Sequence, residues 1–113
     1  MRRFAMVLSI ALILVPAFST AGDGSPAITK HYADLSGGQL HYVTAGEGDA
    51  VLLLHQAPLS HAEFLETIPL LAKHFKVIAW DAPGHGASFI PPEEFGFLDY
   101  LGVLDEFVAF LGT

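Results

Sequence analysis

The 113-residue chain contains no cysteine, which excludes disulfide bridges and thiolate metal sites. It has only five Lys and Arg residues against twelve Asp and Glu, and its formal net charge is −7. Because nucleic acids are bound by basic surfaces, this shortage of cations argues against nucleic acid as a partner. Hydrophobic residues make up 52% of the chain, a share that excludes an intrinsically disordered protein.

Long hydrophobic runs are also lacking. The apolar stretch Phe4–Val15 has about a dozen residues, whereas a membrane-spanning helix needs roughly 20. It follows Arg2 and Arg3, and it precedes a run of small residues that ends at Ala21. This pattern predicts a secretory signal peptide over residues 1–21, cleaved after Ala21, and thus a secreted or periplasmic protein with no membrane partner after cleavage. An N-terminal anchor that is never cleaved is the alternative.

The remaining chain divides into a polar linker, residues 22–28, and a domain that begins at residue 29 and continues to residue 113. The pattern of the domain predicts a β-hairpin, an apolar strand, a helix, a second apolar strand and a final helix. These elements are expected over residues 30–35, 39–44, 51–54, 60–72, 77–80 and 99–111. The strand–helix–strand part is a βαβ unit, so the fold class is α/β. The sheet is unfinished, and its open edge is expected at the strand 77–80.

Capping and breaking residues set the expected helix ends. Ser60 and Glu63 have the spacing of a capping box, so Ser60 is expected as an N-cap. Pro69 is expected to kink or restart that helix near Ile68. Gly112 follows the final helix and is expected as its C′ residue.

Four aromatic or imidazole side chains lie on the hairpin, and we interpret them as residues of the sheet faces. They are His31, Tyr32, His41 and Tyr42. A metal site formed by His31 and His41 is the less favoured alternative. Otherwise no metal and no cofactor is expected.

Each apolar strand is followed by a motif. The first is His55-Gln56-Ala57-Pro58, and the second is the stretch from Asp81 to Ser88, Asp-Ala-Pro-Gly-His-Gly-Ala-Ser. In order and spacing these motifs resemble the His-Gly-x-Pro and Asp-x-Pro-Gly-x-Gly-x-Ser motifs of α/β-hydrolase-fold proteins, with Gln56 in place of the first glycine. The resemblance covers about residues 29–111. It implies the N-terminal part of an α/β-hydrolase sheet, preceded here by a signal peptide.

The resemblance also implies roles for the motif residues. The backbone N–H of Ala57 would be one of the oxyanion-hole donors, which stabilise the negative charge that develops during acyl transfer. Gln56 would be a neighbour in that loop, and His55 would fix the loop through hydrogen bonds beside Pro58. Structural roles in the second turn are implied for Asp81, Gly84, Gly86 and Ser88. Haloalkane dehalogenases resemble one another in having Asn where Ala57 stands, which argues against dehalogenation.

The chain lacks the rest of the catalytic machinery that the resemblance implies. In this family the nucleophile follows the helix that ends near Leu111, and the acid and the histidine come later. No Gly-x-Ser-x-Gly occurs in the sequence, so the nucleophile, acid and base are expected beyond Thr113 and the 113 residues alone are expected to be inactive.

Three interpretations therefore remain open. The favoured one is the N-terminal portion of a secreted hydrolase that acts on a small molecule such as an ester, lactone or epoxide. The others are a non-catalytic remnant or small binding module, and an unrelated small secreted domain. The sequence does not determine the oligomeric state.

Overall fold

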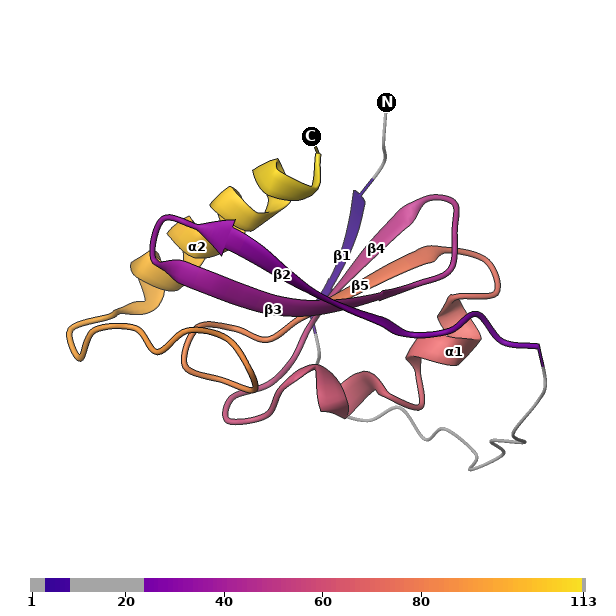
Figure 1. The fold of residues 1–113 in the computed structure, drawn as a ribbon, viewed down its shortest axis with the longest axis horizontal. Helices are drawn as coiled ribbons and strands as arrows, with labels where there is room; N and C mark the ends of the chain where they lie inside the picture. The colour runs from indigo at the N-terminus through magenta and orange to yellow at the C-terminus, as the bar shows by residue number, and fades with distance from the viewer. Residues whose placement is uncertain (1–3, 9–23, 113) are drawn as a thin grey trace.

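A computed structural model of the chain describes residues 4–8 and 24–112. The five strands form one mixed sheet, and the helical segments pack against it (Figure 1). The strands are β1 (Phe4–Leu8), β2 (Thr29–Leu35), β3 (Gly38–Ala45), β4 (Ala50–Leu54) and β5 (Lys76–Trp80). The helices are the 3₁₀ turn η1 (His61–Phe64), α1 (Ile68–Leu71) and α2 (Phe97–Leu111). Among the described residues, no helix has both the length and the apolar character that a membrane crossing requires.

The hairpin forms as predicted, with β2 and β3 antiparallel about a turn at Ser36 and Gly37. His31 pairs with Tyr42 across the hairpin, and Tyr32 pairs with His41. Directly opposed residues share a face and successive residues alternate, so His31 and His41 lie on opposite faces. A metal site from His31 and His41 is therefore wrong. His31 instead stacks on Tyr42 and bonds the Thr44 hydroxyl at 2.8 Å.

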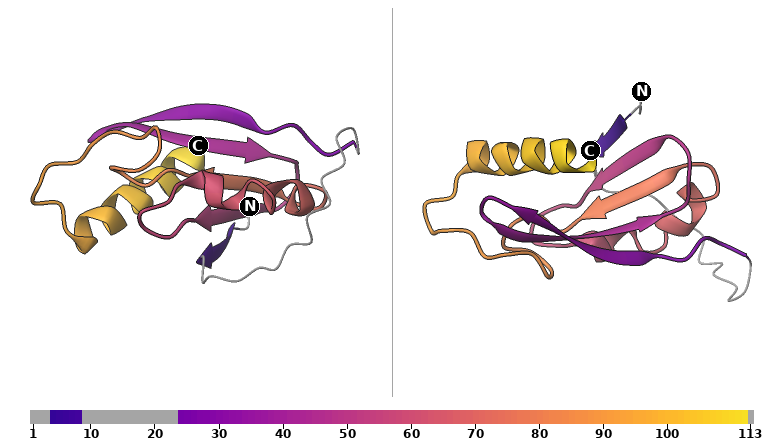
Figure 2. Two further views of the ribbon diagram at one scale, coloured as in Figure 1. Left: turned by 90° about the horizontal axis from the view of Figure 1, so that it is seen from below. Right: turned by 45° about the horizontal axis from the view of Figure 1, so that its top comes forward.

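The apolar strands β4 and β5 are buried on both faces, as their continuous hydrophobic runs predict. Alternate residues point to two separate cores. Leu52 and Trp80 belong to the core that α2 covers with the fully buried Phe107. Leu53 and Val77 belong to the core on the other face, beneath η1 and α1. Figure 2 shows α2 and the η1–α1 segment on these opposite faces of the sheet.

The order of strands is β1-β4-β5-β3-β2, which corrects one expectation. The strand 77–80 was expected to form the open edge, but β5 lies inside the sheet, parallel to β4 and antiparallel to β3. It is enclosed because the hairpin pairs with its other side. The outer side of β4 pairs in parallel with β1, from Phe4 opposite Ala50 to Leu8 opposite Leu54. The cleavage site predicted after Ala21 lies outside the described residues.

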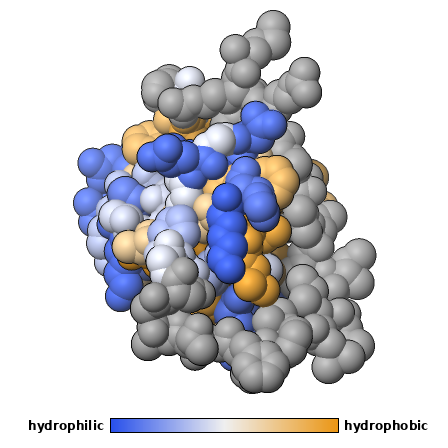
Figure 3. Space-filling view, turned by 90° about the vertical axis from the view of Figure 1, so that its right-hand side faces the viewer, coloured by the Kyte–Doolittle hydropathy of each residue, from blue (hydrophilic) through white to orange (hydrophobic). Residues whose placement is uncertain are grey.

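The connection between β4 and β5 is helical but broken. Ser60 caps η1, because its hydroxyl accepts the Ala62 N–H at 3.2 Å. Pro69 stands in the first turn of α1, which begins at Ile68, so the predicted restart occurs there. The capping differs from a capping box in one bond, because the Ser60 hydroxyl accepts the Ala62 N–H and the Glu63 N–H donates to the Ser60 carbonyl. Near α1 the surface mixes hydrophilic and hydrophobic side chains (Figure 3).

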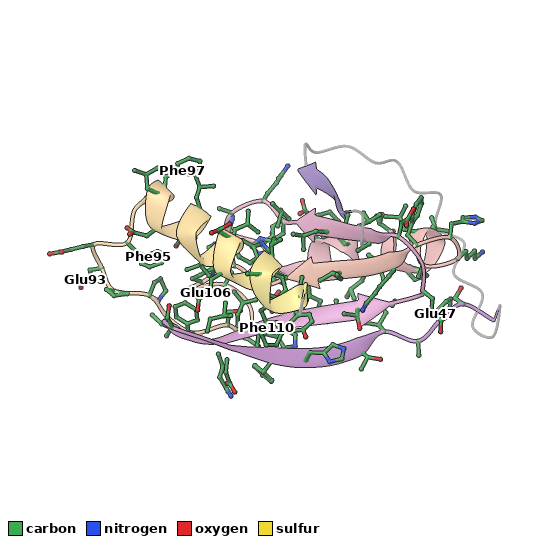
Figure 4. The ribbon with its side chains drawn as sticks, turned by 90° about the horizontal axis from the view of Figure 1, so that it is seen from above. Glu47, Glu93, Phe95, Phe97, Glu106 and Phe110 are labelled. Atoms are coloured by element: carbon green, nitrogen blue, oxygen red, sulfur yellow. The ribbon has the colours of Figure 1, made fainter. Side chains whose placement is uncertain are left out.

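The final helix α2 begins two residues before the predicted start. Its N-terminus is closed by Asp99, whose carboxylate accepts the Gly96 N–H at 2.7 Å. Glu106 bonds the backbone N–H and the hydroxyl of Ser36, which ties α2 to the hairpin, while Phe97 points away from the sheet (Figure 4). Gly112 is the C-cap with a φ of −78°, not the left-handed C′ residue expected.

Candidate active-site loops

The turn after β5, residues 81–88 (the β5 loop), is organised by the carboxylate of Asp81. The side chain is fully buried and accepts four hydrogen bonds. One oxygen accepts the backbone N–H and the ring Nδ1–H of His61, both at 2.7 Å. The other accepts His41 Nδ1–H at 2.8 Å and the Ala87 N–H at 3.1 Å. Asp81 thereby joins β3, η1 and its own turn.

These donors determine the charge of Asp81. Burial opposes its ionisation, but the backbone N–H groups of His61 and Ala87 and the two imidazoles outweigh burial and hold the pKa of the carboxyl below its ordinary value. The carboxylate is therefore ionised at neutral pH. Ser88 completes the turn, since its hydroxyl donates to the Asp81 carbonyl and accepts the His41 N–H at 2.8 Å.

His41, His61 and Asp81 are residue types that bind transition metals, and their ligand atoms lie within 4.8 Å of one another. Each imidazole, however, is placed with Nδ1 against a carboxylate oxygen. With the two backbone donors, these bonds use both oxygens of Asp81 fully. Hydrogen bonding alone accounts for the geometry of this cluster.

The loop after β4, residues 55–60 (the β4 loop), is fixed by His55. Its Nδ1–H donates to the Gln56 carbonyl at 2.9 Å, and its Nε2 accepts the Ala82 N–H at 3.0 Å. This pair of bonds defines a neutral imidazole with the proton on Nδ1. Burial lowers the pKa of His55, and the carbonyl of Gln56 opposes that effect less strongly. His55 therefore holds the two loops together and is not positioned as a free base.

The remaining backbone groups of the β4 loop differ in their partners. The Gln56 N–H donates to the Glu63 carboxylate at 3.0 Å, and the Leu59 N–H donates to the Gln56 carbonyl at 2.7 Å. Pro58 has no N–H, and the peptide bond before it is cis. The N–H of Ala57, an exposed residue, has no acceptor within the described part of the chain. Ala57 thus carries an exposed backbone donor that has no acceptor among the described residues.

The two loops form one region. Both follow the carboxyl ends of the parallel strands β4 and β5, where ligands of open α/β sheets bind. His55 and Ala82 connect them, and the rings of His55 and His85 lie 5.2 Å apart. Gly84 and Gly86 shape the β5 loop with φ values of +80° and +50°. A side chain on Gly86 would overlap the Asp81 carboxylate.

Three residues of this region were not singled out from the sequence as site residues. His41 was interpreted as a sheet-face residue, His61 as part of a helix, and Glu63 as a capping residue. Their roles depend on contacts with residues 7 to 40 positions away. The order of residues carries no local signal for such contacts.

The region can position a carbonyl or alkoxide oxygen, but it contains no assembled nucleophile. Ser88 bonds two backbone groups and not an imidazole. His41 and His61 are directed at Asp81, and His55 is occupied at both ring nitrogens. The chemistry available to these loops is therefore stabilisation of a negative oxygen by backbone N–H.

Comparisons with known proteins agree with this geometry. The profile of the family described as "alpha/beta hydrolase fold" matches residues 49–112. The chain is 42% identical over 88 residues to the soluble epoxide hydrolase of Corynebacterium sp. (strain C12), a match that covers 78% of this chain and 31% of that enzyme. The chain thus spans about a third of the length of that relative.

Two solved structures show the same arrangement. A ligand-free epoxide hydrolase superposes with a TM-score of 0.71 at 42% identity, over 76% of this chain and 30% of that one. A haloalkane dehalogenase from Bradyrhizobium elkani superposes with a TM-score of 0.72 at 33% identity, over 76% of this chain and 30% of the dehalogenase chain. The strand order, the two loops and these matches lead to one conclusion: the chain belongs to the α/β-hydrolase-fold family.

Proposed function

We propose that the chain supplies the N-terminal part of a secreted hydrolase for a small ester-like or related substrate, an epoxide among them. The observation that carries the proposal is the exposed N–H of Ala57 after the carboxyl end of β4, which has no acceptor among residues 4–8 and 24–112. In this role Ala57 donates to the oxygen on which negative charge develops, while the nucleophile, acid and histidine come from beyond Thr113. The epoxide hydrolases among the relatives support the substrate class.

A chimera tests the hydrolase part of the proposal. Residues 29–112 replace the matching segment of the Corynebacterium epoxide hydrolase, which supplies the remaining two thirds of the fold. We expect the chimera to hydrolyse epoxides, because the loop geometry needed for the oxyanion is contained in this segment. A folded chimera without activity would reject the proposal and favour a non-catalytic remnant. Sequencing of the gene downstream of codon 113 provides an independent test, since we expect a strand that carries a nucleophile.

Export is a separate part of the proposal. Arg2 and Arg3, the short apolar stretch and the small residues before Gly22 support cleavage after Ala21. Mass spectrometry of protein recovered from the periplasm or the medium is expected to find Gly22 as the first residue. Recovery of chains that retain Met1 would contradict cleavage and favour an anchor.

A further inference from the structure

Gln56 is fixed on both of its peptide groups. Its carbonyl accepts the Leu59 N–H at 2.7 Å and His55 Nδ1–H at 2.9 Å. Its N–H donates to the Glu63 carboxylate at 3.0 Å. The Gln56 carbonyl and the Ala57 N–H belong to one planar peptide group, so the bonds to that carbonyl orient the Ala57 N–H, and the bond from Glu63 holds the peptide group before it.

The bond from Glu63 is not needed to form η1. Ser60 caps that turn with its own hydroxyl, and the Glu63 N–H donates to the Ser60 carbonyl at 3.0 Å. The carboxylate of Glu63 instead returns seven residues along the chain to Gln56. Phe64, the buried last residue of η1, anchors the turn from which Glu63 extends. A charged acceptor forms a stronger bond than a neutral carbonyl, so this contact restrains the loop more than an ordinary turn bond would.

We propose that Glu63 is the positioning residue of the β4 loop. Its carboxylate fixes Gln56 so that the N–H of Ala57 remains directed to the substrate oxygen. This inference rests on the proposed function, in which Ala57 is the oxyanion donor. Glu63 itself does not touch the reacting atoms.

Nuclear magnetic resonance of the ¹⁵N-labelled full chain tests the contact without any need for activity. We expect the Gln56 amide proton to resonate downfield and to exchange slowly. Glu63→Ala is expected to move it upfield and to raise its exchange rate about tenfold or more, the net effect of losing a hydrogen bond to a charged group. Glu63→Gln is expected to retain most of the protection, because an amide oxygen still accepts. Glu66→Ala, which removes an exposed carboxylate near η1, is the matched control and is expected to change neither signal.

An unchanged Gln56 signal in Glu63→Ala would overturn the inference, as would an equal change in Glu66→Ala. If Glu63→Ala does not fold, Glu63→Gln decides the question: a partial upfield shift of the Gln56 amide proton supports the contact, and no shift overturns it.

The epoxide hydrolase chimera separates this inference from the proposed function. There Glu63→Ala is expected to lower kcat about tenfold with KM changed less than about twofold, because the loop acts on the transition state. Unchanged kcat in an active chimera would overturn the role of Glu63. An inactive parent chimera would reject the proposed function instead, and the Gln56 signal in the full chain would still decide whether Glu63 positions the loop.

Discussion

The two loops at the carboxyl ends of β4 and β5 differ in how completely their polar groups are paired. In the β5 loop, the Asp81 carboxylate has four donors and the Ser88 hydroxyl has two partners. In the β4 loop, the N–H of Ala57 has none among the described residues. The hydrogen bonds that converge on Asp81 and Ser88 contribute stability, whereas the Ala57 N–H, exposed at the surface, is available to a ligand. The difference therefore separates a loop that supports the site from a loop that can act on a substrate.

The largest effect is expected from Asp81→Ala. It leaves four donors in a buried region without their acceptor, and loss of one partner from a buried charged cluster costs about 3–5 kcal/mol. Urea unfolding of the full chain, followed by circular dichroism, measures it. Asp105→Ala removes an exposed carboxylate from α2 and is expected to change the unfolding midpoint little. Equal midpoints for the two variants would show that the Asp81 network does not stabilise the fold.

The second prediction concerns the β4 loop and catalysis. Ala57→Pro in the chimera removes the unpaired N–H and is expected to lower kcat by about 10²–10³-fold, equivalent to about 3–4 kcal/mol. Gln56→Gly restores the family's usual residue and is expected to be mild. Circular dichroism checks that the proline variant is folded. If a folded Ala57→Pro enzyme kept more than about a tenth of kcat, Ala57 would not be the donor.

The third prediction tests the close packing of the β5 loop. Gly86→Ala places a Cβ against the Asp81 carboxylate at a φ of +50°, and we expect a loss of about 2–3 kcal/mol. Gly102→Ala is the control, because that position in α2 is open and alanine favours the helix by up to about 1 kcal/mol. Thermal unfolding of both variants should therefore move in opposite directions. A destabilised Gly102→Ala, or an unchanged Gly86→Ala, would contradict this description of the packing.

The smallest effect is expected from pH, through the half-buried His55 that joins the loops. Its pKa is lowered in the folded chain from the ordinary 6.5, so the unfolded chain binds more protons below that pH. The contribution of neutral His55 to the free energy of unfolding is therefore fully present above about pH 6.5. It decreases as the pH falls toward the pKa of His55 in the folded chain. Urea midpoints between pH 7.5 and 5 measure the slope. His55→Asn is expected to reduce the slope, while the exposed His74→Gln should keep it; equal slopes in wild type and His55→Asn would contradict the assignment.

The fold was largely predictable because its signals are local. The continuous apolar run of β4, the turn at Ser36 and the break at Pro69 each act through neighbouring residues, and the structure places strands, hairpin and helix restart accordingly. The position of β5 within the sheet was not predictable in this way. It depends on pairing with β3, more than thirty residues earlier in the chain.

The candidate site, too, was predictable from the sequence only where its signals are local. The motifs placed Ala57 and Asp81 at the ends of neighbouring strands, but they did not indicate that His41 and His61 meet at Asp81. Likewise, the spacing of Ser60 and Glu63 predicts a capping box, yet the carboxylate of Glu63 bonds Gln56. Spacing along the chain measures only local geometry, whereas these bonds join residues that the fold brings together from 7 to 40 positions apart.

The sequence by itself determined the α/β class, the apolar strands, the two loop motifs and the resemblance to the hydrolase family, because periodicity, turn residues and motif order are properties of neighbouring positions. Only the tertiary structure decided which strands enclose β5, which donors bond the Asp81 carboxylate and which described loop N–H groups lack an acceptor. Those outcomes depend on groups brought together from β3, η1 and the two loops. The physical reason is that a buried polar group must find a partner wherever the fold supplies one, irrespective of its distance along the chain.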